Sequence, residues 1–274
     1  MSPYPGPGFA SRRWPILLLA CAALLLGGAD GPERIIGGPA TGGCLTGAIQ
    51  LPTRGEGFET IHLQRSSFWG APGTIQRIEL LGRQAHDAGL PELYVEDISR
   101  RFGGPLPGGH LSHQVGLDAD VGLDMRPRPP LWDTAREQME LPSLVRPDGR
   151  GVVPERWSSR VIMLLQLAAG LPDVDRVLVN PAIKQQLCED VTGDRSWLRL
   201  IRPWYGHAAH MHIRFRCPAG QAECQQQPPP PEGDGCDASL QWWFDQLDHP
   251  TRPSGPQRVP TPPAACRAIL ARNG

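Results

Sequence analysis

The chain carries no excess of either charge. Its 27 basic residues nearly balance its 28 acidic ones, and the formal net charge is −1. Lysine is almost absent, since Lys184 is the only one in 274 residues. Binding to nucleic acid or to an anionic membrane surface depends on a basic field, so the balance argues against both partners. Affinity for a substrate must therefore come from a local site.

Several common enzyme signatures are missing as well. The sequence has no H-E-x-x-H helix, no G-x-S-x-G elbow and no Walker A loop. These absences argue against the commonest zinc-protease arrangement, the serine-hydrolase elbow and a P-loop nucleotide site. No internal repeat is found either.

No apolar run reaches the length of an ordinary transmembrane helix. The run from Trp14 to Leu26 is shorter than the roughly 20 residues that spanning requires. Arg12 and Arg13 precede it and Gly27-Gly28-Ala29 follows, which predicts a signal peptide over residues 1–29. We expect one mature domain at 30–274 without stable membrane insertion, and an uncleaved anchor is the alternative.

The cysteines indicate an oxidising compartment. Cys21 would leave with the signal, and six cysteines would remain, an even number that predicts three disulfides in an exported chain. These six are Cys44, Cys188, Cys217, Cys224, Cys236 and Cys266. Six cysteines allow 15 pairings, and only Cys217 and Cys224 are close enough in sequence to suggest a local bridge.

Hydrophobic periodicity predicts a single α+β domain. We expect helices over 74–88, 158–169 and 181–189, and strands over 93–98, 119–124, 174–179 and 210–217. Asn180 and Pro181 suit the cap and first position of the third helix. Prolines concentrate in loops, and the segment from about 225 to 274 predicts a proline-rich, loop-rich cap.

Five of the eight histidines fall in two short windows, His110–Asp120 and His207–His212. Residues two apart on a strand face the same side, so His210 and His212 would enter one cleft. A catalytic zinc ion takes three protein ligands and keeps a fourth position for water, whose pKa falls towards about 7. His113, Asp120 and one histidine of the pair would be the ligands.

The remaining histidine of the pair would act as a base. Asp118 and Asp124 have the same strand parity as Asp120, so the position of the carboxylate ligand stays open between the three. The other three histidines are assigned no functional role; they are His62, His86 and His249.

The segments around these residues match a known set of signatures, in order, over nearly the whole mature chain. They are Gly43-Cys44, Gly108 to Gln114 through Asp120, Asn180 to Cys188, Arg202 to Trp204, His207 to His212, and Gly233 to Cys236. On these motifs the chain resembles the penicillin-insensitive murein endopeptidase family, which groups with lysostaphin and D-Ala-D-Ala peptidases as LAS-type zinc peptidases.

The resemblance implies a LAS-type domain with a central antiparallel sheet, flanking helices and a disulfide-tied, loop-rich periphery. It implies His113, Asp120 and His212 as zinc ligands, His210 as catalytic base, and His207 as a neighbour that steadies the transition state. His110 is a metal ligand or a cleft residue, and the sequence does not decide between them. The implied bridges are Cys44–Cys266, Cys188–Cys236 and Cys217–Cys224.

The family also carries an auxiliary metal site, for which Asp148 would supply a carboxylate. The chain departs from the pattern at Gly151, where relatives have a histidine shortly after that aspartate. We therefore expect one catalytic zinc ion and doubt a second permanent metal.

The implied function is a periplasmic, β-lactam-insensitive endopeptidase that hydrolyses peptidoglycan crosslinks at the D-alanyl to meso-diaminopimelate bond. Two alternatives stay open. A D-Ala-D-Ala carboxypeptidase would bind a free carboxylate through a cation in the cleft, for which Arg202, Arg214 and Arg216 are candidates. A zinc-bearing binding module would have lost catalysis. The oligomeric state is not defined by the sequence.

Overall fold

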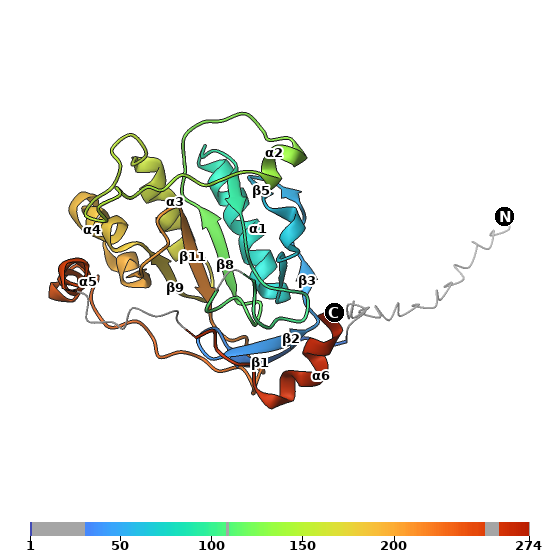
Figure 1. The fold of residues 1–274 in the computed structure, drawn as a ribbon. Helices are drawn as coiled ribbons and strands as arrows, with labels where there is room; N and C mark the ends of the chain where they lie inside the picture. The colour runs from blue at the N-terminus through green and yellow to red at the C-terminus, as the bar shows by residue number, and fades with distance from the viewer. Residues whose placement is uncertain (2–30, 108–109, 250–257, 274) are drawn as a thin grey trace.

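The computed structural model describes Met1 and residues 31–107, 110–249 and 258–273. Apart from Met1, the expected signal peptide lies outside these residues, as do Gly108, Gly109 and part of the proline-rich segment. Figure 1 shows a central sheet, with the strand ribbon of residues 34–46 beside it and the C-terminal helices at the periphery. In the described part of the chain no helix is long and apolar enough to cross a membrane.

The central sheet has seven strands in the order β10-β9-β11-β8-β7-β5-β4. Their bounds are Ile201–Pro203 (β10), Val174–Val179 (β9), His210–Phe215 (β11), Asp118–Gly122 (β8), Leu93–Val95 (β7), Phe58–Thr60 (β5) and Arg54–Gly55 (β4). The pairs β9–β11, β11–β8 and β8–β7 are antiparallel, as expected for the centre of the sheet. The outer pairs β10–β9 and β5–β7 are parallel, so the sheet as a whole is mixed.

The expected helices and strands are present with small shifts at their ends. The strand predicted over 93–98 ends early, at Val95. Glu96 and Asp97 still exchange backbone hydrogen bonds with Asp120, and Ile98 then donates its N–H to Ser67 O at 2.7 Å instead. Strand β11 ends at Phe215. Two short ribbons lie outside the main sheet, formed by Arg34–Gly38 (β1) with Gly42–Thr46 (β2) and by Ile49–Gln50 (β3) with Trp69–Gly70 (β6).

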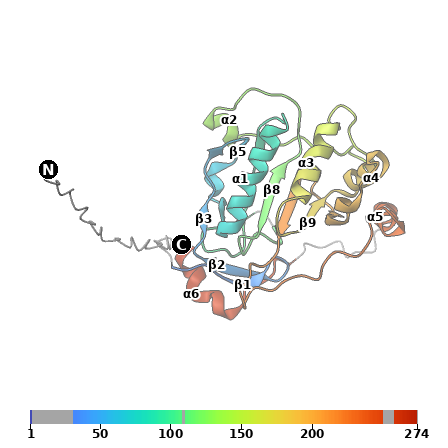
Figure 2. The same cartoon turned by 180° about the vertical axis from the view of Figure 1, so that it is seen from behind.

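Helices lie over one face of the sheet and around its margins. The helices are Pro72–Asp87 (α1), Asp133–Glu137 (α2), Ser159–Ala169 (α3), Pro181–Asp190 (α4), Ala238–Asp248 (α5) and Arg267–Leu270 (α6), with 3₁₀ turns at Leu63–Arg65 (η1), Ser196–Leu200 (η2), Ala264–Cys266 (η3) and Ala271–Asn273 (η4). Figure 2 shows α1 and α3 in front of the strands. Asn180 caps α4 by accepting the N–H of Ala182 at 3.0 Å, as the sequence predicts.

Strand alternation separates the core from the site. On β11 the side chains of Met211, Ile213 and Phe215 are buried in the apolar core. The intervening residues, His210, His212 and Arg214, therefore face the other side of the sheet. The sheet thus presents one apolar face to the helices and one polar face to a cleft.

Three disulfides tie the periphery to the domain. Cys44–Cys266 joins β2 to the C-terminal turns, Cys188–Cys236 joins α4 to the segment before α5, and Cys217–Cys224 closes a loop after β11. These are the pairings that the resemblance implies. In the chain-entropy picture, the bridge of 222-residue separation restricts the unfolded chain most.

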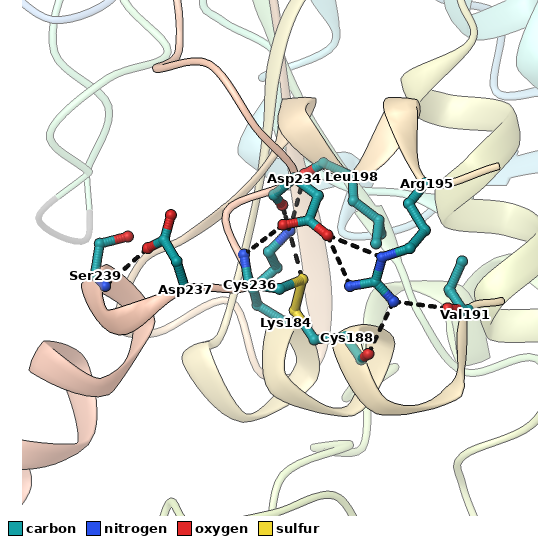
Figure 3. Close-up of a disulfide and its surroundings, with 9 residues drawn as sticks. All are labelled: Lys184, Cys188, Val191, Arg195, Leu198, Asp234, Cys236, Asp237 and Ser239. Carbon is teal, nitrogen blue, oxygen red and sulfur yellow. Dashed lines mark hydrogen bonds and ion pairs between the residues drawn. A yellow bond between two sulfur atoms is a disulfide. The ribbon is translucent and has the colours of Figure 1, made fainter. Parts of the chain in front are cut away.

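A buried amine reinforces the second disulfide. Lys184 is fully buried on α4, and its Nζ donates to Leu198 O at 2.9 Å and to Asp234 O at 2.5 Å. Figure 3 shows this amine beside Cys188 and Cys236. Burial, with Arg202 nearby, lowers the pKa of Lys184 to about 7. The contacts fix the segment that leads into α5 against α4.

Candidate metal centre

Two adjacent strands carry the centre of the cluster. His212 on β11 lies directly opposite Asp120 on β8, and both side chains are almost completely buried. Opposed residues of an antiparallel pair project from the same face. The register therefore brings together two groups that are 92 residues apart in sequence.

His113 reaches the same point from the loop before β8. Its backbone is left-handed, with φ 64°, a conformation that costs energy in a residue other than glycine. The strain is held by two contacts, because Nδ1 lies 3.0 Å from Ile98 O and the backbone N–H donates to Asp118 at 3.2 Å. These contacts leave Nε2 of His113 directed at Asp120.

Asp120 is shared by three imidazoles. Its Oδ2 lies 3.2 Å from Nε2 of His113 and 3.7 Å from Nε2 of His210, and its Oδ1 lies 3.0 Å from Nδ1 of His212. Ligand atoms of His110, His113 and Asp120 lie within 4.8 Å of one another and could hold a metal ion. The rings of His113 and His212 are 4.6 Å apart at their centroids, so His212 borders the same point.

The donors suit zinc. Zinc binds imidazole nitrogen and carboxylate oxygen at about 2.0–2.1 Å in a tetrahedron, which places neighbouring ligand atoms roughly 3.3 Å apart by simple geometry. The distance from Oδ2 of Asp120 to Nε2 of His113, 3.2 Å, is close to that value, whereas Nδ1 of His212 lies 3.0 Å from the other oxygen, Oδ1. The three residues whose ligand atoms lie within 4.8 Å of one another are His110, His113 and Asp120, and His212 adjoins them.

Of the three aspartates with the same strand parity, only Asp120 occupies the centre. Asp118 is fully buried, accepts from Nε of Arg214 at 2.8 Å, and lies 2.8 Å from Nε2 of His212. Asp124 instead pairs with Arg126 through both carboxylate oxygens, at 2.8 and 2.9 Å. Asp118 thus contacts Nε2 of His212, the ring nitrogen that is not directed at Asp120, whereas Asp124 is held by Arg126.

His210 lies on the open side of the cluster. Its Nε2 faces Asp120, and its Nδ1 lies 3.4 Å from Oε2 of Glu96. The other oxygen of Glu96 lies 3.2 Å from Nδ1 of His62. Burial, followed by the charge of Asp120, raises the pKa of Glu96 to about 7.

Sequence reasoning missed Glu96 and gave His62 no role. Glu96 follows directly after β7, which pairs with β8. Glu96 lies inside the strand predicted over 93–98, and an acidic residue within that strand was the available signal. This signal could not be given a role as long as it was unknown that β7 and β8 are neighbours.

His110 and His207 flank the cluster. The His110 ring is 5.4 Å from that of His113, and its Nε2 lies 3.6 Å from Asp97, a carboxylate held by Arg65 and Ser67. His207 is left-handed, with φ 42°, and its ring is 5.4 Å from that of His210. Burial, followed by the charge of His212, lowers the pKa of His207 to about 3, so it is neutral at physiological pH.

The cluster holds opposite charges close together. Burial alone would lower the pKa of His113, but the carboxylate of Asp120 outweighs it and raises that pKa to about 9. The pKa of Asp120 is held well below its ordinary value, because His113 and His210 outweigh the effect of burial. A protonated His113 and the carboxylate of Asp120 therefore form a buried ion pair.

The structure does not bring Asp148 into the cluster. It lies in an exposed turn, where it is 3.7 Å from the guanidinium of Arg146. A Cβ at Gly151 would meet that guanidinium at 2.6 Å. Among the described residues, Asp148 has no ligand-forming neighbours of the kind found around Asp120.

The cluster opens into a cleft of 880 Å³ on the polar face of the sheet. One wall is aromatic, with Trp204 and Trp243 rings 5.9 Å apart at their centroids and Tyr205 donating its hydroxyl to Trp243 O. Arginines also line the cleft. An extended polar ligand can therefore lie across the cluster.

A family model described as penicillin-insensitive murein endopeptidase matches residues 35–271. The chain belongs to the penicillin-insensitive murein endopeptidase family. Proteins of that name from Klebsiella pneumoniae subsp. pneumoniae and Salmonella arizonae are 42% and 43% identical to it, over 233 and 236 residues. Each match covers 85% of this chain and 85% of the relative. Membership of the murein endopeptidase family thus extends over the sheet, the cluster and all three disulfides.

Proposed function

We propose that this protein is a zinc endopeptidase that hydrolyses peptide crosslinks of peptidoglycan, at the bond between D-alanine and meso-diaminopimelate. The observation that carries the proposal is the position of Asp120, which lies within 3.2 Å of both His113 and His212 with His210 beside it at the cleft. Family membership supports a peptidase that acts on murein.

His113, Asp120 and His212 would hold the zinc ion. Bound zinc supplies Lewis acidity, which polarises a carbonyl group and lowers the pKa of water. Asp118 and Ile98 O fix the second nitrogens of the two histidine ligands and so set which nitrogen each presents.

His210 would move the proton. Glu96 lies against Nδ1 and favours a proton there, which leaves Nε2 as the base toward the attacking water. The same nitrogen then delivers the proton to the departing amine. Glu96 stabilises the imidazolium that forms between these steps.

His207 would contact the transition state from the side. Its Nδ1 lies 3.2 Å from Tyr205 O, so the neutral ring donates there and presents an unprotonated Nε2. Stabilising a developing oxyanion would require this ring to take up a proton. His207 could therefore steady the transition state, as the resemblance implies, only in its protonated form.

The family name favours an endopeptidase over the carboxypeptidase and the non-catalytic module. A base beside the ligands also fits catalysis better than a closed structural site. The three disulfides fit an oxidising compartment, and we propose the periplasm. Cell fractionation with a tagged chain tests that location.

The activity is tested with purified mature protein and crosslinked muropeptide dimers, with and without chelator. We expect dimers to become monomers, chelator to stop the reaction and added zinc to restore it. Release of free D-alanine from pentapeptide monomers, without dimer cleavage, would instead identify a carboxypeptidase. Dimers left intact by the zinc-loaded protein would contradict the proposal.

A further inference from the structure

One row of residues crosses the polar face of the sheet. Arg202 on β10 is paired with Leu178 on β9, Leu178 with His212 on β11, and His212 with Asp120 on β8. Partners across neighbouring strands project from the same face. Because strands lie about 4.8 Å apart, Arg202 begins roughly 10 Å from His212 and rises into the same cleft.

Of the other arginines that line this cleft, Arg258 is exposed, and the remaining two are already engaged. Nε of Arg214 donates to Asp118 at 2.8 Å and its Nη1 donates to Gln227 at 2.7 Å. Arg176 donates to Asp175 and to Pro228 O, both at 2.6 Å. These contacts give each guanidinium a structural role.

Arg202 differs from them. It is partly buried, lines the cleft, and makes no hydrogen bond or ion pair within 4 Å with any residue in the described ranges. Burial and the like charge of Arg176 lower its pKa, and the exposed carboxylate of Asp237 only partly opposes this effect. Arg216, the third candidate from the sequence, is exposed and does not line the cleft.

A partly buried guanidinium without a partner is unfavourable, and a carboxylate is the ligand that best satisfies its fork of N–H donors. The proposed substrate carries such a group. In a D-alanyl to meso-diaminopimelate crosslink, the scissile nitrogen is attached to a carbon that bears a free carboxylate. That carboxylate is separated from the scissile carbonyl carbon by only the amide nitrogen and one carbon.

We propose that Arg202 forms a subsite for the carboxylate on the leaving side of the scissile bond. The inference rests on the proposed function and assigns it an orientation: the diaminopimelate half lies over β9 and β10, and the D-alanyl half lies on the opposite side of the cluster. A terminal D-Ala-D-Ala places its carboxylate at the same distance from the scissile bond. Arg202 therefore recognises a feature that both substrates share and does not by itself separate endopeptidase from carboxypeptidase.

The test uses zinc-loaded mature protein and two crosslinked dimers, one with this carboxylate free and one with it amidated. Arg202→Gln should lower kcat/KM for the free carboxylate about 10- to 100-fold, chiefly through KM, and should change the amidated dimer little. Arg202→Lys should restore part of the loss. The matched control is Arg216→Gln, which should behave as wild type on both dimers.

An equal loss on both dimers would overturn the subsite, and so would no loss on either. Calorimetric binding of the monomer product, which retains the carboxylate, separates the two proposals. Weaker product binding by Arg202→Gln supports the subsite even if the wild-type protein cleaves neither dimer. The absence of cleavage would contradict only the proposed reaction. Unchanged product binding counts against the subsite whatever the turnover.

Discussion

Oε2 of Glu96 lies 3.4 Å from Nδ1 of His210, on the side of the ring away from Asp120. A carboxylate at this position selects the tautomer of the imidazole and stabilises its protonated form. His210, the base of the proposed reaction, therefore depends on Glu96, a residue that follows a different strand, β7. Nδ1 of His62 lies 3.2 Å from the other oxygen of Glu96.

Replacing Glu96 by glutamine should remove the charge that this carboxyl carries above its pKa of about 7, while keeping the shape of the side chain. We expect kcat to fall by about 100-fold or more, with KM and bound zinc nearly unchanged, because Glu96 is not among the proposed ligands. Steady-state kinetics and metal analysis of the same preparation measure both quantities. Glu79→Gln on α1 is the control, and zinc loss in Glu96→Gln would show that the carboxylate supports the metal instead.

Replacing His210 and replacing His212, both on β11, should have different effects on bound zinc. His210→Ala should lower kcat by about 10²- to 10⁴-fold and retain about one zinc ion per chain, because its ring is the outer one. His212→Ala should lose the metal itself, since it removes the nitrogen that lies 3.0 Å from Asp120. Elemental analysis after dialysis decides, and normal zinc content in both variants would show that the assignment of the pair is wrong.

The period of two along a strand was enough to place His210 and His212 on one face. It could not choose between Asp118, Asp120 and Asp124, which share that parity. The choice depends on the register of β8 against β11 and on the local pair of Asp124 with Arg126. Register is a long-range property that one sequence does not display.

Glu96 was beyond reach for the same reason, and Arg202 could be named only as one of three candidate cations. Glu96 reaches His210, and Arg202 reaches the cleft, because the strand that carries or precedes each residue lies next to another strand that is distant in sequence. The helices, by contrast, could be predicted from local features. Apolar spacing marked α1, and the Asn180 cap with Pro181 marked the start of α4.

Asp118 and Asp124 provide a matched pair of substitutions. Asp118→Asn should weaken zinc binding about 10- to 100-fold, because Asp118 holds the far nitrogen of His212 and such supporting contacts have effects of that size. Asp124→Asn should leave zinc binding unchanged. Competition with a chelating indicator measures both dissociation constants, and equal effects would contradict the distinction drawn from their contacts.

Zinc binding should release a proton and weaken in acid. Asp120 raises the pKa of His113 to about 9, so at pH 7 the metal-free site holds this proton, which a metal ion must displace. Below pH 9 the affinity should therefore fall, by up to about tenfold per pH unit for this one group. Calorimetry in buffers of different ionisation enthalpy counts the protons, and a zinc affinity that stays constant from pH 9 to pH 7 would contradict the charge pair.

Lys184 should contribute to stability independently of the disulfide beside it. Lys184→Met removes a buried amine and leaves the carbonyls of Leu198 and Asp234 without their donor, so the free energy of unfolding should fall by about 1–3 kcal/mol. Urea unfolding measures the change, with the Cys188–Cys236 bridge intact in both proteins. Because the Gly235 backbone lies against both Lys184 and Arg202, KM should rise as well. A stable variant with unchanged KM would show that the disulfide alone positions this segment.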